Sequence, residues 1–169
     1  NYSILSHGVF DGSDLVVIGF LSANSTGSFS GLDNTIIPRK YPNTSYQGLI
    51  AKIDLEGSVI WQNPIYSNID LRTGMWTNVG VDEEKNIYGY FPFKNKISYN
   101  NVEMQFDATN GNKVISKFDP NGTNLYFNSL LPGKQNSSLE NTSIDVIGTN
   151  LYSINGVTYE NKFLEYPLQ

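Results

Sequence analysis

Apolar residues along this chain come in short runs that turn-forming residues separate. The runs are rich in Val, Ile, Tyr and Phe and are bounded by Gly, Asn and Asp, which is typical of β-strands joined by turns. No eleven-residue window keeps an apolar stripe at i, i+3, i+4 and i+7 free of Gly, Pro or Asn, so no helix is predicted. The pattern therefore predicts an all-β chain. The clearest strands are expected at Leu15–Ile18, Leu49–Ile53, Ser58–Trp61, Ile87–Phe91, Val114–Phe118 and Leu125–Phe127, with leading strands at Ile4–Phe10, Trp76–Val81 and Ser143–Ile147.

Two of these stretches are copies of one another. Leu49–Trp61 aligns without a gap on Val114–Tyr126. Each copy reads as a hairpin: a strand, an Asp-x-x-Gly turn, and a second strand that ends in an aromatic residue. Gly57 and Gly122 are expected to take the left-handed conformation that such a turn needs, and the Asp carboxylate is expected to accept turn N–H groups.

The copied hairpins also carry a lysine at the same position, two residues before the aspartate. These are Lys52 and Lys117. We interpret them as solvated lysines at a sheet edge, the usual place for a lysine in a strand.

The spacing of the copies predicts modules of similar length. Asp119 stands 65 residues after Asp54. The organisation expected from this spacing is one β-repeat domain with four strands per module, divided at about 1–68, 69–134 and a partial 135–169. Each module has a long connection in its middle. In the first module this is Leu21–Gln47, expected to be a surface loop because it is rich in Ser, Gly, Asn and Pro. In the others, Ile97–Asn101 resembles Val157–Asn161, which predicts an extra short strand or hairpin.

The order of these motifs resembles the bacterial β-propeller repeat family. The blades of that family read as an acidic turn, Gly-Asn-x-Tyr, and a Lys-x-Asp-x-x-Gly-x-x-x-Trp hairpin, and the best matches here are Val81–Tyr88 and Ile50–Trp61. The resemblance covers most of the chain and implies antiparallel four-stranded, β-propeller-like blades. It implies no particular activity.

The number of modules is too small for a closed ring. The third module reaches its Asn-Leu-Tyr strand at Asn150–Tyr152 and the sequence given stops at Gln169, whereas closed propellers have four to eight blades. We therefore expect an incomplete ring, as a segment of a longer chain. The alternatives are closure through another chain, or strands that pack as a β-sandwich or barrel.

The amino-acid composition excludes or disfavours several kinds of binding partner. The net charge is −5 and the eleven basic residues are scattered, which disfavours nucleic acid as a partner. No apolar run is long enough for a membrane-spanning helix, so membrane insertion is not expected. The chain has no cysteine, which excludes disulfides and thiolate metal sites. Together with the polar, Asn-rich composition, this favours an extracellular or cell-surface protein.

Few residues suggest catalysis. The single histidine, His7, lies in a predicted strand and is interpreted as a partly buried structural residue. The acidic cluster Asp82–Glu84 is interpreted as a solvated turn, with weak Ca²⁺ binding as the alternative. We therefore predict no catalytic residues, no metal ligands and no cofactor.

Aromatic residues are the remaining candidates for binding. Trp76, Tyr41, Tyr46 and Trp61 lie near strand ends or in loops, where aromatic faces can stack on sugar rings or anchor a protein. Packing in the core or at strand ends is the alternative for each tryptophan.

These observations lead to three hypotheses. The first is a non-enzymatic module for adhesion, protein–protein interaction or assembly, whose partner is a protein or another part of the parent chain. Its binding surface would be the loops at Leu21–Gln47 and Phe93–Gly111. The second is a carbohydrate-binding module that uses the loop aromatics on a glycan. The third is part of a propeller hydrolase whose carboxylates converge only in a full ring.

Overall fold

The computed structural model describes residues 3–23, 27–42, 44–67, 77–93, 96–99, 102–105, 112–129, 142–147, 150–155 and 162–167. Every regular element in these ranges is a β-strand, so the all-β prediction is confirmed. The strands are β1 (Ser3–Phe10), β2 (Leu15–Ser22), β3 (Phe29–Ser30), β4 (Ile36–Ile37), β5 (Tyr46–Ile53), β6 (Val59–Ser67), β7 (Asn78–Val81), β8 (Ile87–Phe93), β9 (Lys96–Tyr99), β10 (Val102–Gln105), β11 (Asn112–Phe118), β12 (Asn124–Ser129), β13 (Thr142–Ile147), β14 (Asn150–Asn155) and β15 (Lys162–Pro167).

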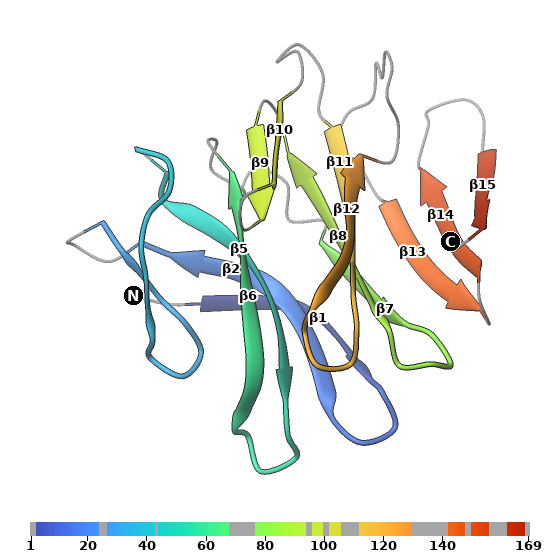
Figure 1. Ribbon diagram of the computed structural model, residues 1–169, viewed down its shortest axis with the longest axis horizontal. Coiled ribbons are helices and arrows are strands. Elements are labelled where there is room, and N and C mark those ends of the chain that lie inside the picture. Colours follow the sequence, from blue (N-terminus) through green and yellow to red (C-terminus); the bar gives the residue numbers. More distant parts are fainter. Residues whose placement is uncertain are drawn as a thin grey trace.

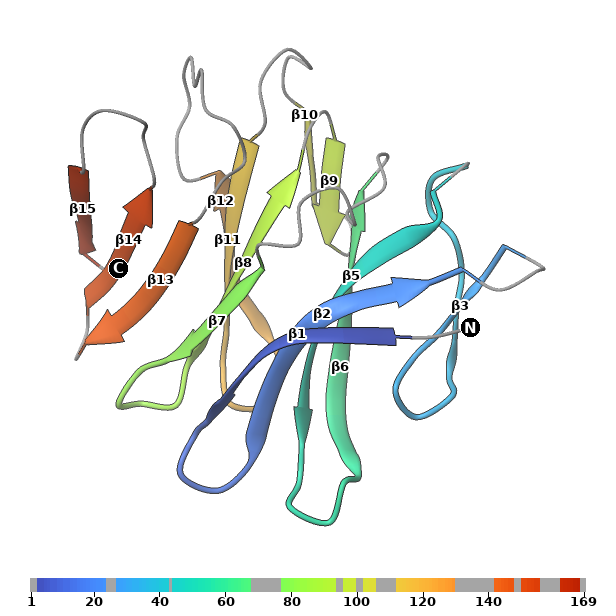
Figure 2. The ribbon, with the colours of Figure 1, turned by 180° about the vertical axis from the view of Figure 1, so that it is seen from behind.

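The strands form three open antiparallel sheets and one small hairpin (Figure 1). The first sheet has the order β1-β2-β5-β6-β9-β10, the second β12-β11-β8-β7, and the third β13-β14-β15, while β3 pairs with β4. Among the strands that the structure describes, no sheet closes on itself. The first strands of the three sheets are neighbours, since β7 contacts both β1 and β13, as both views show (Figures 1 and 2).

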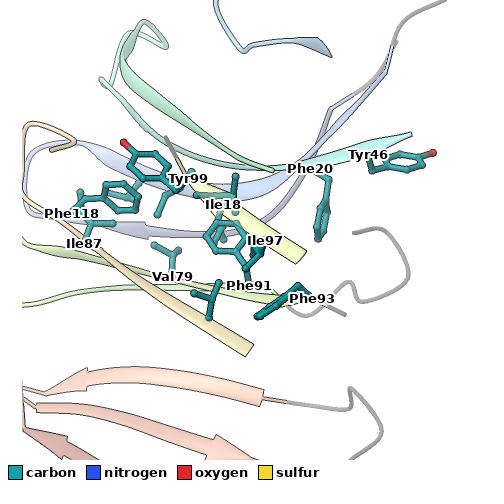
Figure 3. Close-up of a cluster of buried hydrophobic side chains, with 14 residues drawn as sticks. Ile18, Phe20, Tyr46, Val79, Ile87, Phe91, Phe93, Ile97, Tyr99 and Phe118 are labelled. Atoms are coloured by element: carbon teal, nitrogen blue, oxygen red, sulfur yellow. The ribbon is translucent and has the colours of Figure 1, made fainter. Parts of the chain in front are cut away.

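The main core lies between the first and second sheets (Figure 3). Because side chains alternate along a strand, Val16, Ile18 and Phe20 of β2 face the second sheet, while Val17 and Leu21 face away from it. Burial of this apolar surface is the main force that holds the two sheets together. The buried residues are Val16, Ile18, Phe20, Tyr46, Ile50, Ile65, Val79, Ile87, Phe91, Phe93, Ile97, Tyr99, Val114 and Phe118.

A second core shows that the first insertion is more than a surface loop. Phe29 and Ile37 of the β3–β4 hairpin are buried against the outer face of the first sheet, where Val17, Leu21 and Leu49 lie. The prediction of a surface loop at 21–47 was therefore wrong for this part of the insertion. Its polar composition concealed two apolar side chains that cover the sheet.

The insertion of the second module reaches across to the first sheet. The predicted extra hairpin is present as β9–β10, and β9 pairs with β6 through Tyr66↔Ser98 and Ser67↔Ile97. The first sheet thus gains two strands from a distant part of the sequence. The similar segment at 157–161 lies outside the described residues.

The turns of the copied hairpins have matching geometry. The carbonyl of Asp54 accepts the Gly57 N–H at 3.1 Å, and its Oδ1 accepts the Ser58 N–H at 2.7 Å; the corresponding bonds to Asp119 are 3.0 and 2.7 Å. Gly57 and Gly122 have φ of 90° and 83°. The predictions of left-handed glycines and of a carboxylate cap are both confirmed.

A third turn, Asp82–Asn86, has the same hydrogen bonds without a glycine. The Lys85 N–H donates to the Asp82 carbonyl at 2.9 Å, and the Asn86 N–H donates to Asp82 Oδ1 at 2.7 Å. Lys85 takes the glycine position with φ of 63°, a conformation that costs a residue with a Cβ about 1–2 kcal/mol. Glu83 and Glu84 are exposed on this turn, as predicted.

Candidate interaction surface

The two long insertions meet beside the outer strands of the first sheet. The Tyr41 hydroxyl, from the first insertion, donates to Glu103 Oε2 on β10 at 2.5 Å and lies 3.2 Å from Ser98 Oγ on β9. Lys96 Nζ is 3.0 Å from the other carboxylate oxygen of Glu103. The structure therefore joins the two segments that the sequence predicted as binding loops.

The titration behaviour of this cluster follows from its contacts. Burial raises the pKa of Tyr41, and its hydrogen bond to the Glu103 carboxylate raises it further. The same hydrogen bond, together with Lys96, lowers the pKa of Glu103 below its usual range. At neutral pH the tyrosine is therefore a protonated donor and the glutamate a charged acceptor.

Two lysines lie around this hydrogen bond. Lys40 Nζ lies 5.9 Å from the ring centroid of Tyr41 and 6.0 Å from that of Tyr66. Tyrosine is enriched where proteins bind one another. We call Lys40, Tyr41, Lys96 and Glu103 the insertion surface.

A buried charge cluster lies on the sheet side that faces the second sheet. Lys52 on β5 is 6% exposed, and its Nζ is 2.7 Å from Asp11 Oδ2 and 3.2 Å from Asp14 Oδ2. The Asp11 Oδ2 contact lacks the alignment of a directional hydrogen bond and is an ion pair. The prediction that Lys52 is a solvated edge lysine was wrong, because β5 lies between β2 and β6 in the sheet.

The turn that precedes β2 holds both aspartates in place. Asp11 Oδ1 accepts the backbone N–H groups of Ser13 and Asp14 at 2.9 and 2.8 Å. Burial alone would raise the pKa of Asp11, but Lys52 and these hydrogen bonds outweigh burial and hold it well below its usual range. Burial likewise lowers the pKa of Lys52, and the two carboxylates more than compensate and raise it. Asp11 and Lys52 are therefore both charged at neutral pH.

Lys117, the residue of the second sheet that corresponds to Lys52, has different neighbours. Tyr88 stands where the first sheet has Val16, and its hydroxyl donates to Asp82 Oδ2 at 3.0 Å. Lys117 is half-buried with Nζ 5.1 Å from the Tyr88 ring centroid. The prediction of a solvated edge position was therefore also wrong for Lys117, whose strand β11 lies between β8 and β12.

Trp61 packs between sheets. Its Nε1–H donates to the Pro120 carbonyl at 3.1 Å, and Asn63 Nδ2 donates to the Gly122 carbonyl at 2.8 Å. Its ring lies 6.0 Å from that of Phe118. A Cβ at Gly122 would fall 2.6 Å from Trp61 Cδ2, so this glycine is needed for contact as well as for its φ. Packing at a strand end, the alternative considered for Trp61, is what the structure shows.

The other residues that the sequence analysis singled out lie in different parts of the structure. Tyr46 is the first residue of β5 and is buried in the main core, so the prediction of a loop aromatic was wrong there. Trp76 lies outside the described residues. His7 is on β1 as predicted, yet it is exposed rather than partly buried, because β1 is an edge strand. Tyr41 is the candidate that the structure places on the insertion surface.

Sequence reasoning missed Glu103, Asp11 and Asp14. The position of Asp11 and Asp14 before a strand resembles that of Asp82 and Asn86, and this resemblance is the signal that could have found them. Across the described ranges, no three His, Cys, Asp or Glu side chains are grouped so as to hold a metal ion. The part of the chain that the structure describes also has no helix long and apolar enough to cross a membrane.

Comparison with known proteins gives no further identification. No protein-family model, curated protein or solved structure shows a significant match to the chain.

Proposed function

We propose that this chain is a non-enzymatic β-propeller-like module that binds a protein partner through the insertion surface, outside the cell or at the cell surface. The observation that carries the proposal is the contact of Tyr41 with Ser98 and Glu103. This contact fixes two insertions, from separate parts of the chain, into one surface. Binding residues are often presented in this way, on loops that a rigid β-scaffold supports.

The arrangement of sheets supports the propeller-like part of the proposal. The first strands β1, β7 and β13 are neighbours, and the sheets extend from them in the order of the chain, as blades do around an axis. The long insertions come after the second strand of each of the first two sheets. This places the insertion surface among the outer strands, where a partner can reach it.

The insertion surface can be tested with paired variants. The labelled 169-residue chain would be applied to an array of purified extracellular-matrix and cell-surface proteins. We expect binding to a captured protein to fall by at least about tenfold when Lys40 and Tyr41 are replaced by Ser. The matched control is Leu55→Ser, which changes a residue that is 73% exposed on the hairpin turn of β5–β6. If the Lys40 and Tyr41 variant binds the captured partner with full affinity, the proposal is refuted.

The same chain on a glycan array tests the carbohydrate alternative. The described aromatics do not form one platform, because Tyr46 is in the core and Trp61 lies against a turn. We therefore expect no glycan to be bound in a manner that depends on Trp61 or Tyr46.

A further inference from the structure

The second sheet packs on a neighbouring sheet with each of its two faces. Ile115, the equivalent of Ile50 in the copied hairpin, packs with Val146 of the third sheet. Val114 and Phe93 lie on the opposite face and belong to the main core against the first sheet. One face of the second sheet therefore covers the sheet that follows it, and the other covers the sheet that precedes it. Ile50 itself lies in the main core, so the first sheet uses the same face for the sheet that follows.

The other face of the first sheet carries the β3–β4 hairpin in place of a sheet. Leu49 stands where the second sheet has Val114. The strand register likewise places Leu21 where the second sheet has Phe93. Leu21 and Leu49 are fully buried, and they pack with Phe29 of the hairpin. The hairpin therefore occupies, on the first sheet, the position that the first sheet occupies on the second.

The hairpin is fastened at two places across this face. A β-bridge joins Ala23, which follows β2, to Phe29. On β6, Gln62 Oε1 accepts the Leu32 N–H at 2.9 Å, and Gln62 Nε2 donates to Asp33. Strand β5 lies between β2 and β6, so these contacts hold the hairpin over the middle of the sheet.

The hairpin covers only part of the face. Phe10 and Leu15 pair with one another at the opposite end of β2 from Leu21 and are 55% and 40% exposed. The register makes Val81 and Ile87 their equivalents in the second sheet, where both pack in the main core. The whole face therefore has the apolar character of a surface that packs on another sheet.

We propose that the β3–β4 hairpin is a cap that keeps another sheet from packing on the first sheet, and that two copies of this chain pair through this face when the cap is removed. A second copy is the occupant that fits, because the equivalent face of the second sheet packs on a sheet of this same chain. A two-fold contact uses the same patch on both copies. Burial of Val17, Leu21 and Leu49 would drive the pairing.

Excision of the first insertion tests the cap directly. The Ala23 N–H donates to the Ser45 carbonyl at 2.8 Å, so an Asn-Gly turn, which is typical of two-residue hairpins, can replace residues 24–44. We expect the wild-type chain to be monomeric and the excised chain to form a dimer in sedimentation equilibrium. Adding Ala51→Glu, on the uncovered face, should restore the monomer. Adding Leu125→Glu, at a residue that is 55% exposed on the second sheet, should not.

A double substitution loosens the cap without removing it. Phe29→Ser with Ile37→Ser should make tryptic cleavage after Arg39 at least about tenfold faster, because the hairpin then opens more often. The same variant should form the dimer. The matched control is Ile36→Ser, which changes a residue of the same hairpin that is 72% exposed, and it should alter neither measurement.

Three results would overturn the proposal: a folded, excised chain that stays monomeric, a dimer that Ala51→Glu leaves intact, or a wild-type dimer that Leu15→Glu dissociates. Circular dichroism checks that the excised chain folds; if it does not, the double variant is judged by the same three results. None of these measurements includes a partner protein. Their outcome is therefore distinguishable from failure of the proposed binding through the insertion surface.

Discussion

The buried lysine of the first sheet gives the sharpest test of the structure. Replacing Lys52 with Met keeps most of the aliphatic stem and removes the ammonium between two aspartates. At an effective dielectric constant of about 20, the contacts at 2.7 and 3.2 Å correspond to gross attractions of about 6 and 5 kcal/mol. Desolvation of the three charges offsets much of this, and removal of one partner from a buried ion pair typically costs about 3–5 kcal/mol. We expect Lys52→Met to lower the free energy of unfolding by that amount.

Lys117→Met is the matched control. It changes the same residue type at the corresponding position of the second hairpin, where the lysine is half-buried over the ring of Tyr88. Loss of that cation–π contact should cost about 0.5–1 kcal/mol. Urea denaturation followed by tryptophan fluorescence measures both variants.

A double variant separates charge from packing. Adding Asp11→Asn to Lys52→Met removes the buried charge left without its partner, so part of the lost stability should return. If Lys52→Met costs no more than Lys117→Met, or if the added Asp11→Asn lowers stability further, the ion-pair interpretation is wrong.

Four further substitutions test the turns and the insertion surface. Gly57→Ala and Gly122→Ala should both lose about 1 kcal/mol for their positive φ, and Gly122→Ala should lose at least about 1 kcal/mol more from overlap with the indole; equal losses in urea denaturation would contradict the packing. Lys85→Gly should raise the free energy of unfolding by about 1 kcal/mol by relieving the left-handed conformation, and a lower denaturation midpoint would count against it. Because the pKa of Glu103 is lowered, its contribution is present above the ordinary value of 4.5 and is lost as pH falls through the depressed pKa. Tyr41→Phe should move that pKa back toward 4.5 in an NMR titration, and an unchanged pKa would exclude the hydrogen bond.

Local patterns in the sequence were sufficient to predict most of the long strands and the two Asp-x-x-Gly turns. Alternating apolar residues and the Asp-x-x-Gly spacing act over a few residues, so the strand positions and the left-handed Gly57 and Gly122 could be predicted. The environment of Lys52 depends on which strand lies beside it and on a turn about forty residues earlier. A single sequence carries no direct signal for such a contact.

The insertion surface shows the same limit. Tyr41 was a candidate because it lies in a polar loop, and this signal is local. Its partner Glu103 is 62 residues away and reaches it only because β9 pairs with β6. No spacing rule connects the two, and the polar composition of the first insertion likewise concealed the burial of Phe29 and Ile37.

The pairing of β9 with β6 also has a consequence for the order in which the protein folds. Strand β6 ends at Ser67, whereas β10 ends at Gln105. At ribosomal rates of about 5–20 residues per second, strands β1, β2, β5 and β6 would wait about 2–8 s for the hairpin that pairs with the end of β6 at Tyr66 and Ser67. During that interval, the end of β6 offers unpaired backbone groups to any neighbouring nascent chain. The rate of translation therefore affects how long the end of β6 stays unpaired. Synonymous codons that slow the ribosome between residues 68 and 95 would lengthen this interval and favour aggregation.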